Sequence, residues 1–456
     1  MSLSPSNLLV TLPAHARGAF RERMASLKKS PAQAGILGGS LIMLLGSVLV
    51  SAINFGYNVA TAHLLGPAAF GHASVAVTLL MLASAVTLAF QLLCAKFVAR
   101  NPTAGQKLSV IRVLRDRAWS LSIPLALVLA LFSGPIAAYL RLPSGAVVLL
   151  LAIGILFYIP LGVKRGGLQG VCDFRRLTGN FVLESAVKFL AAVVLMVILL
   201  NVAGENAAML GAVAAITLSV IAAYYFPRLS PELRNQQNLA HAVAAIPSQF
   251  LEGMQASVFF IGQVLINNID IVLVKHFFPP REAGFYAAIA LVGRVLYFAA
   301  WSVVSAMFPI TAQAKPEEES NFYLRVPIFL VLLISSGFVL MTALFPHLIM
   351  HVGFGAAFHG PEESLLAFYA TATGLYALSV VLMAYEISRK IANTAWIQLI
   401  FSGLVIVGID FFHSTLLEVI EVQIVLMLAL LITVSIPFVM FRPRRQARAL
   451  STQEAA

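Results

Sequence analysis

The chain has 456 residues, of which 60% are hydrophobic and only 11% are charged, with 30 Lys and Arg against 19 Asp and Glu. A soluble domain of ordinary composition carries about 25% charged residues, so this chain has too few of them to cover itself with a solvated surface. The composition therefore excludes a large soluble catalytic domain, a nucleic-acid-binding domain and a disordered protein, and it predicts an integral membrane protein.

Apolar runs long enough to cross a bilayer recur along the whole chain, separated by short polar breaks. A transmembrane helix needs about 20 such residues to cross roughly 30 Å of hydrocarbon. Residues 1–33 contain five Lys and Arg and are predicted to form a cytoplasmic N-terminal tail rather than a signal peptide. We predict an all-α integral membrane protein whose twelve transmembrane helices lie approximately at 34–62, 69–95, 118–140, 144–163, 177–200, 206–226, 243–274, 283–311, 326–346, 364–385, 392–410 and 419–440.

The basic residues alternate between the two sides that these spans define. Lys and Arg are retained on the cytoplasmic side during insertion, so their distribution predicts orientation. With the N-terminus inside, 25 of the 30 Lys and Arg fall in the tails and inside connections, whereas Arg141, Lys275 and Arg281 lie in or beside outside loops. Both termini are therefore expected to be cytoplasmic. The four arginines of the C-terminal tail, residues 442–456, are expected to lie against anionic lipid headgroups.

The two halves of the chain are related by a shift of 213 residues without a gap. This shift predicts two pseudo-symmetric lobes of six helices, an N-lobe over 34–228 and a C-lobe over 243–441, joined by a cytoplasmic linker at 229–242. Because six is even, the repeat is parallel, and such lobes frame a central cavity that transporters open to either side. Identical residues that meet under the shift include Ile53 and Ile266, Asn54 and Asn267, His63 and His276, Pro67 and Pro280, and Gly71 and Gly284.

Three short motifs carry a family resemblance. Residues 65–71 read Leu-Gly-Pro-Ala-Ala-Phe-Gly after a first span dotted with Ser and Asn. Residues 204–214 carry Gly-x6-Gly-Ala-x-Ala, and residues 267–270 read Asn-Asn-Ile-Asp. Together they resemble the polysaccharide transporter branch of the superfamily that also holds the multidrug and toxin extrusion proteins. The second lobe departs from the turn motif, with Phe-Pro-Pro-Arg-Glu-Ala-Gly at 278–284, so the sugar carried is left open.

This resemblance implies a flippase for surface polysaccharide biosynthesis in a bacterial inner membrane. Such a protein moves undecaprenyl-diphosphate-linked oligosaccharide units from the cytoplasmic to the periplasmic leaflet by alternating access. Its expected partners are the lipid-linked anionic oligosaccharide, the membrane lipids and the polysaccharide polymerase machinery, with no nucleic acid among them.

Arg294 is the foremost candidate for binding an anionic substrate. It lies eleven residues into the eighth span, roughly 16 Å from the outer end at 1.5 Å per residue. A guanidinium at that depth requires an anion or water, and both the diphosphate of a lipid carrier and an ion pair with Asp270 meet that requirement. Tyr297 and Trp301 follow on the same helical face, where they either pack against sugar rings or fill the interior as ordinary aromatic residues.

The first and seventh spans each carry a polar stripe, and the repeat makes these two helices equivalent. Stripes in both favour one shared cavity between them, and the alternative is that small polar residues hold neighbouring helices together. The stripe of the first span contains Ser40, Ser47, Ser51, Asn54, Asn58 and Thr61. The stripe of the seventh span contains Glu252, Gln255, Gln263, Asn267 and Asp270.

Glu184 and Lys188 have the i, i+4 spacing of an ion pair within one helix. If they pair, neither needs a function, and if they do not, Lys188 adds a second cation to the cavity. Glu184, Glu252 and Asp270 are the candidates for proton coupling, because burial favours the neutral form of a carboxyl group.

The outside-facing His347, His351 and His359 have no Cys or acidic ligand beside them in a recognisable zinc pattern, so we expect no metal and no cofactor. The sequence contains no GxxxxGK[ST], GxSxG or HExxH motif, so we expect no enzyme and no catalytic residue. Two alternatives stay open. A cation-coupled multidrug exporter of the same superfamily would have an acidic cleft, and a membrane-embedded glycosyltransferase or ligase would have a large outside loop with carboxylates.

Overall fold

We describe a computed structural model of the chain over residues 31–226, 258, 261–313, 320–389 and 395–440, and in this part of the chain it contains helices and no strand. The helices are α2 (Pro31–Arg100), α3 (Ala104–Leu131), α4 (Ser133–Tyr139), α5 (Ala146–Gly170), α6 (Phe174–Ala203), α7 (Glu205–Tyr225), α10 (Ile269–Phe277), α11 (Pro280–Gln313), α12 (Ser320–Leu344), α13 (Pro346–Phe354), the short 3-10 helix η1 (Pro361–Ser364), α14 (Leu365–Arg389), α15 (Ala395–Phe411) and α16 (Leu416–Met440).

The long helix α2 contains the first two predicted spans. They are separated at Gly66, whose φ of 69° and ψ of 178° are not helical. Glycine adopts positive φ at little steric cost, and the proline that follows has no N–H to donate. Eight described helices are long and apolar enough to cross a membrane, or nine if α3 and α4, which meet at 66°, form one span. Most of the predicted seventh span and the predicted linker at 229–242 lie outside the described residues, so the count of twelve stays a prediction.

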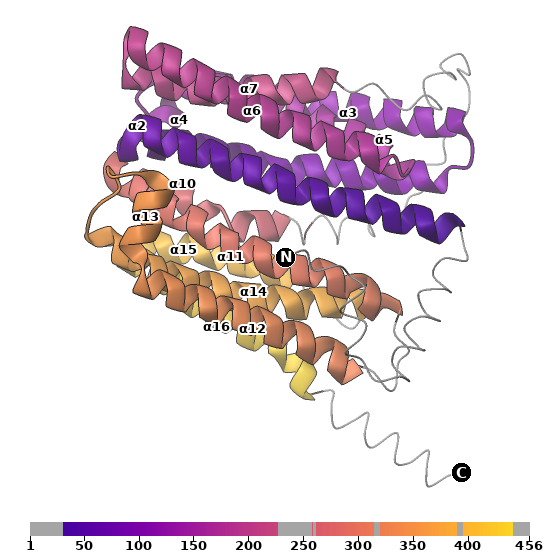
Figure 1. Ribbon diagram of the computed structural model, residues 1–456. Coiled ribbons are helices and arrows are strands. Elements are labelled where there is room, and N and C mark those ends of the chain that lie inside the picture. The colour runs from indigo at the N-terminus through magenta and orange to yellow at the C-terminus, as the bar shows by residue number, and fades with distance from the viewer. Residues whose placement is uncertain (1–30, 227–257, 259–260, 314–319, 390–394, 441–456) are drawn as a thin grey trace, which may run out of the picture.

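The helices form two bundles that lie side by side (Figure 1). The N-bundle contains α2 to α7, and the C-bundle contains α10 to α16. Each has its own apolar core, with Ile159 and Met196 fully buried in the first and Phe285 and Leu430 in the second. Many other leucines and valines are exposed, Leu127 and Leu340 for example at 58% each. Exposed apolar side chains of this kind suit a surface in contact with lipid tails.

Helices in the two bundles begin at positions 213 residues apart, so the structure shows the same repeat as the sequence. The start of α4 at Ser133 is aligned with the start of α13 at Pro346. Pro67 and Pro280 are also aligned, and Pro280 is the first residue of α11. α7 and α16 occupy equivalent positions at the end of each bundle. The two bundles are therefore built from the same succession of helices.

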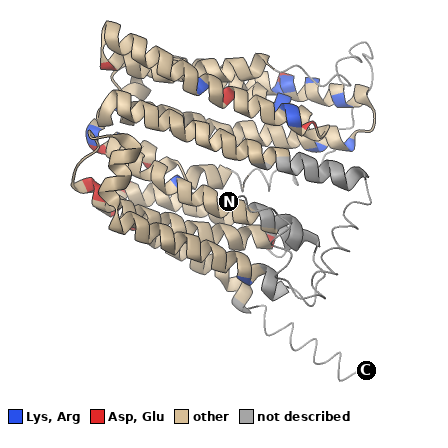
Figure 2. Ribbon diagram, in the orientation of Figure 1, with Lys and Arg blue, Asp and Glu red and all other residues tan. Residues whose placement is uncertain are grey.

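Basic residues gather at one end of the N-bundle (Figure 2). That end lies opposite α4 and α13, and we call the two ends of the molecule the basic end and the α4/α13 end. The pattern is the one predicted for a cytoplasmic basic end. Two basic residues were misplaced by the prediction: Lys164 and Arg165 were counted in the connection after a span ending at 163, but α5 continues to Gly170, and Arg165 is only 2% exposed.

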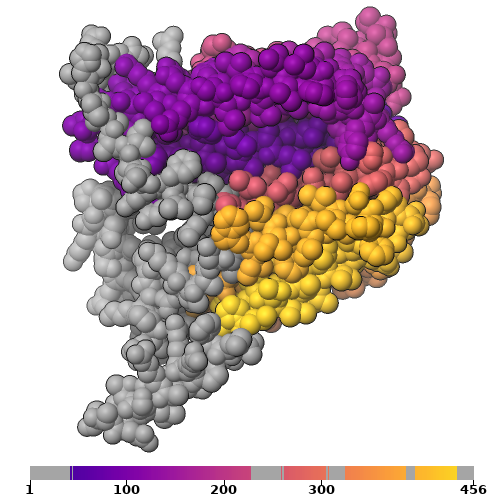
Figure 3. Space-filling view, turned by 180° about the vertical axis from the view of Figure 1, so that it is seen from behind, coloured from indigo at the N-terminus to yellow at the C-terminus, as the bar shows by residue number. Residues whose placement is uncertain are grey.

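The two bundles touch at the α4/α13 end, as the space-filling view from behind also shows (Figure 3). A Cβ atom built on Gly71 would lie 2.9 Å from the backbone nitrogen of Gly284, and one built on Gly284 would lie 1.8 Å from the carbonyl oxygen of Pro67. The Phe70 ring packs edge to face on Phe354, with 5.9 Å between the ring centroids. Only glycine permits this approach of the two backbones, so the α4/α13 end is closed.

Candidate substrate site between the two bundles

Arg294 of α11 reaches across to the N-bundle. Its Nη1 lies 3.7 Å from the Sδ of Met81 in α2, and its Nη2 donates a hydrogen bond of 3.3 Å to the carbonyl oxygen of Asn267. Met81 and Arg294 are 213 residues apart and are thus equivalent positions of the repeat. Residues related by a twofold axis can touch only close to that axis. Arg294 therefore lies near the pseudo-symmetry axis. Its guanidinium cation is on one side of the axis, and the thioether of Met81 is on the other.

The carbonyl that Arg294 contacts lies at an interruption of the helix. Residues 261–266 are helical, residues 267 and 268 form a turn, and α10 begins at Ile269. Non-helical backbone inside a membrane is tolerated where it is buried in protein or lines a cavity, and interrupted helices often frame substrate sites. The side chain of Asn267 donates to the carbonyl oxygen of Gln263 at 2.8 Å. Its repeat partner Asn54 has a buried Oδ1 without a hydrogen-bonding partner in the described part of the chain.

Arg294 and Asp270 do not form an ion pair in the structure. Asp270 is 1% exposed, and its Oδ2 accepts hydrogen bonds from the hydroxyls of Tyr286 at 2.8 Å and Tyr369 at 2.9 Å. Among the described residues, Arg294 has no carboxylate within 4.0 Å, and its buried Nε has no hydrogen-bonding partner. A guanidinium with an unused donor favours an anionic ligand.

Asp270 belongs to a network that joins four helices of the C-bundle. Gln423 of α16 donates from Nε2 to the hydroxyl of Tyr286 at 2.6 Å, and that hydroxyl donates to Asp270 of α10. Tyr369 comes from α14, and its ring meets that of Tyr286 edge to face at 5.7 Å. The Oδ1 of Asp270 is buried and has no partner in the described part of the chain. The sequence predicted Asp270 as a site residue but did not single out the two tyrosines or Gln423.

Three aromatic rings stack along the C-bundle beside Arg294. The ring of Tyr297 lies 6.3 Å from that of Trp301 and 5.8 Å from that of Tyr376, with interplanar angles of 24° and 22°. Gln263 donates a hydrogen bond to the Tyr297 hydroxyl. Tyr297 and Trp301 were predicted from their spacing after Arg294. Tyr376 was missed, because it lies on α14 and only packing brings it to this stack.

Of the two possibilities for Glu184 and Lys188, the structure has the unpaired one. The carboxylate of Glu184 instead accepts a charge-assisted hydrogen bond from the Nη2 of Arg165, whose Nε donates to Asn180 at 2.7 Å. The ammonium of Lys188 lies over the ring of Tyr57, 5.1 Å from its centroid. In the described residues no carboxylate lies within ion-pair distance of Lys188, which packs inside the N-bundle against the buried Tyr57.

The two polar stripes lie only partly within the described residues. Glu252 and Gln255 lie outside the described residues, as does the side chain of Ser40. In the stripe of the first span, Ser47, Asn58 and Thr61 donate to carbonyl oxygens of their own helix. Hydrogen bonds made within one helix do not join it to a neighbour, so these three bonds give no support to a role in holding helices together.

The fold is similar to those of several solved membrane proteins. A structure described as the inward-facing conformation of a multidrug resistance MATE family transporter of the MOP superfamily matches with a TM-score of 0.70 and 12% identity, covering 89% of this chain and 98% of the other. A structure of the lipid II flippase MurJ in an inward closed conformation matches with a TM-score of 0.65 and 11% identity, covering 87% of each chain. At these identities the likeness concerns the fold.

A search of curated proteins gave no match. A sequence profile described as polysaccharide biosynthesis protein matches residues 36–315, which is more than half of the chain. The matched region includes both repeat equivalents at the pseudo-symmetry axis, Met81 and Arg294. The chain belongs to the polysaccharide biosynthesis protein family, and its fold is similar to those of the MATE and MurJ structures.

Proposed function

We propose that the chain is a flippase that moves undecaprenyl-diphosphate-linked oligosaccharide from the cytoplasmic to the periplasmic leaflet of a bacterial inner membrane. The observation that carries the proposal is the position of Arg294 beside the pseudo-symmetry axis, in contact with Met81 and without a carboxylate partner among the described residues. Two comparisons support the proposal. The chain matches a family of polysaccharide biosynthesis proteins, and the lipid II flippase MurJ has a similar fold.

The chemistry of the substrate fits the groups at the interface. Its diphosphate is an anion that would be costly to move through hydrocarbon alone, and a guanidinium can bind it with two parallel hydrogen bonds. Arg294 is the group placed to do so, with Lys188 as a second cation on the N-bundle. The sugar units would pack against Tyr297 and Trp301, whose flat rings suit the apolar faces of sugars. The carrier's polyprenyl chain would remain in the lipid.

The closed α4/α13 end supports transport by alternating access. The close contact of Gly71 with Gly284 would hold this end shut, as the periplasmic end, while substrate enters from the cytoplasmic, basic end. Rocking of the two bundles would then separate this contact, open the periplasmic end and close the basic end. The transport step itself makes and breaks no covalent bond in the substrate, so it needs no catalytic residue. Product would pass to the polymerase machinery on the periplasmic side.

Asp270 is the residue we propose for proton coupling. Its Oδ2 receives both tyrosine hydrogen bonds, so the buried Oδ1 is the atom at which a proton would bind. Protonation would weaken the two hydrogen bonds to the carboxylate and loosen α10 from α11 and α14. Glu184 is less suited because it is paired with Arg165. A cationic drug exporter would use Asp270 as its binding group, but the two tyrosines already occupy one oxygen of that carboxylate.

The test is transport of a fluorescent undecaprenyl-diphosphate oligosaccharide in proteoliposomes, followed with a membrane-impermeant quencher. Replacing Arg294 with Ala should slow flipping by roughly 10- to 100-fold, the size of one lost charge-assisted interaction. Arg294→Lys should be intermediate because a point charge cannot bind both phosphates in the same way. Arg281→Ala, on the same helix but exposed at the α4/α13 end, is the control. Unchanged flipping in well-folded Arg294→Ala would overturn the proposal.

A further inference from the structure

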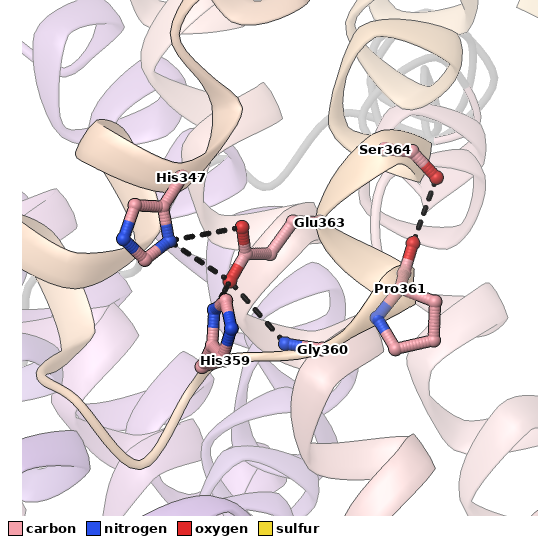
Figure 4. A network of polar contacts seen from close by, with 6 residues as sticks. All are labelled: His347, His359, Gly360, Pro361, Glu363 and Ser364. Atoms are coloured by element: carbon pink, nitrogen blue, oxygen red, sulfur yellow. Dashed lines mark hydrogen bonds and ion pairs between the residues drawn. The ribbon is translucent and has the colours of Figure 1, made fainter.

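Two histidines and a glutamate converge at the α4/α13 end, away from the substrate site (Figure 4). His347 is the second residue of α13, His359 precedes η1, and Glu363 lies in η1. The Nδ1 of His347 lies 3.2 Å from Oε2 of Glu363, and the Nδ1 of His359 lies 3.0 Å from its Oε1. The side chain of Glu363 is 9% exposed, whereas those of His347 and His359 are 61% and 71% exposed.

These three side chains have the geometry of a metal site. One ligand atom from each lies within 4.8 Å of the other two. Ligand atoms about 2.0–2.1 Å from a tetrahedral zinc ion are separated by about 3.3 Å, so the three ligand atoms would draw closer together around a bound ion. Two imidazoles and one carboxylate are a ligand set that favours zinc and the neighbouring first-row metals, and they leave a fourth position for water.

The site is supported by its surroundings. The backbone N–H of Gly360 donates to Oε1 of Glu363 at 3.3 Å and so orients the carboxylate. Outer contacts of this kind hold metal ligands in position. The segment that the three residues bracket also packs against the N-bundle, because Phe354 and Phe358 both contact Phe70. A metal ion would therefore tie the two ends of this segment together where the two bundles meet.

We propose that His347, His359 and Glu363 form a binding site for a divalent transition-metal ion, with Zn²⁺ favoured by the ligand set. The sequence predicted no metal because no acidic ligand stands beside the histidines in a familiar zinc spacing. Glu363 is the acidic ligand, four residues after His359 and 16 after His347, and this spacing belongs to no familiar zinc motif. His351, which shares a helical face with His347, does not belong to the group of ligand atoms that converge.

Binding is tested with Zn²⁺ on the full-length chain, purified in detergent without a histidine tag and stripped of metal. Calorimetric titration should give one equivalent of tightly bound zinc. His347→Ala, His359→Ala and Glu363→Gln should each weaken that binding at least tenfold. His413→Ala removes another histidine, near the end of α15, and should leave it unchanged. X-ray absorption of the bound zinc should report nitrogen and oxygen ligands without sulfur.

Two outcomes would overturn the proposal. The first is binding no tighter in the wild-type chain than in His359→Ala, which changes an exposed side chain and should not disturb folding. The second is zinc binding that falls equally in His413→Ala, which would show general attraction to histidines. Thermal unfolding without metal checks that each variant is folded. Because zinc binding is measured without substrate, its result is independent of the proposed flippase activity.

Discussion

Arg294 and Met81 touch across the two bundles, and the 213-residue repeat makes them equivalent positions. The repeat is thus symmetric in backbone and asymmetric in charge at its axis. A single cation at this point can bind one anionic group, whereas two symmetric arginines would repel each other in a medium of low dielectric constant. This asymmetry is the feature on which the proposed transport depends.

Placing a second arginine at the axis should slow transport strongly. Met81→Arg would bring two guanidinium groups to within a few ångströms of each other, and their repulsion should separate the bundles at this level. We expect flipping in proteoliposomes to fall at least tenfold. Met81→Leu, which keeps the volume and the apolar character, should retain it. Equal transport by both variants would show that position 81 does not face Arg294.

Neutralising Asp270 should remove the pH dependence of transport while leaving the protein folded. Asp270→Asn keeps the size of the side chain, and its amide oxygen can still accept from the hydroxyls of Tyr286 and Tyr369. Flipping by the wild-type chain should increase when a proton gradient is imposed across the proteoliposome membrane, and flipping by the variant should not respond. A variant that keeps its full response to the gradient would place the coupling group elsewhere.

We expect Glu184 to be needed for stability and Lys188 to be needed for transport. Glu184→Gln leaves the buried guanidinium of Arg165 without its counterion, which typically costs 3–5 kcal/mol. We expect a clear fall in the thermal unfolding temperature in detergent. Lys188→Met removes a cation that has no carboxylate partner in the described residues, so it should unfold near the wild-type temperature but flip more slowly. The opposite pattern in the two variants would reverse these roles.

The glycine contact at the α4/α13 end should control which side is closed. In Gly284→Ala the new methyl carbon would lie 1.8 Å from the carbonyl oxygen of Pro67, so the two bundles must move apart. Gly337→Ala is the matched control, because nothing lies within 4 Å of a Cβ atom built there. Distances between spin labels on the two bundles at this end should lengthen in the first variant only. No change in either variant would mean that this contact does not hold the end closed.

The sequence predicted that Tyr297 and Trp301 share one face of α11, because helical period carries that information. It also predicted the repeat, from identities such as Pro67 with Pro280. It could not predict that Met81 meets Arg294, since which equivalent positions touch depends on where the pseudo-symmetry axis passes. Nothing in one sequence fixes how two packed bundles lie relative to each other.

The errors have a common physical origin. Lys188 was considered as a partner for Glu184 because they are one turn apart, yet Arg165 on a neighbouring helix forms the ion pair. Arg165 itself was assigned to a loop, because a charged residue lowers the hydropathy by which span ends are placed. In both cases the partner lies on another helix, and burial of an ion pair depends on that packing.

The most direct test of the account is the position of the lipid diphosphate in an experimental structure of the full chain bound to its undecaprenyl-diphosphate oligosaccharide. We predict phosphate density within hydrogen-bonding distance of the Arg294 guanidinium, between the two bundles and next to Met81. Density for the diphosphate at a site without Arg294, or a guanidinium that points into lipid in the bound state, would contradict it.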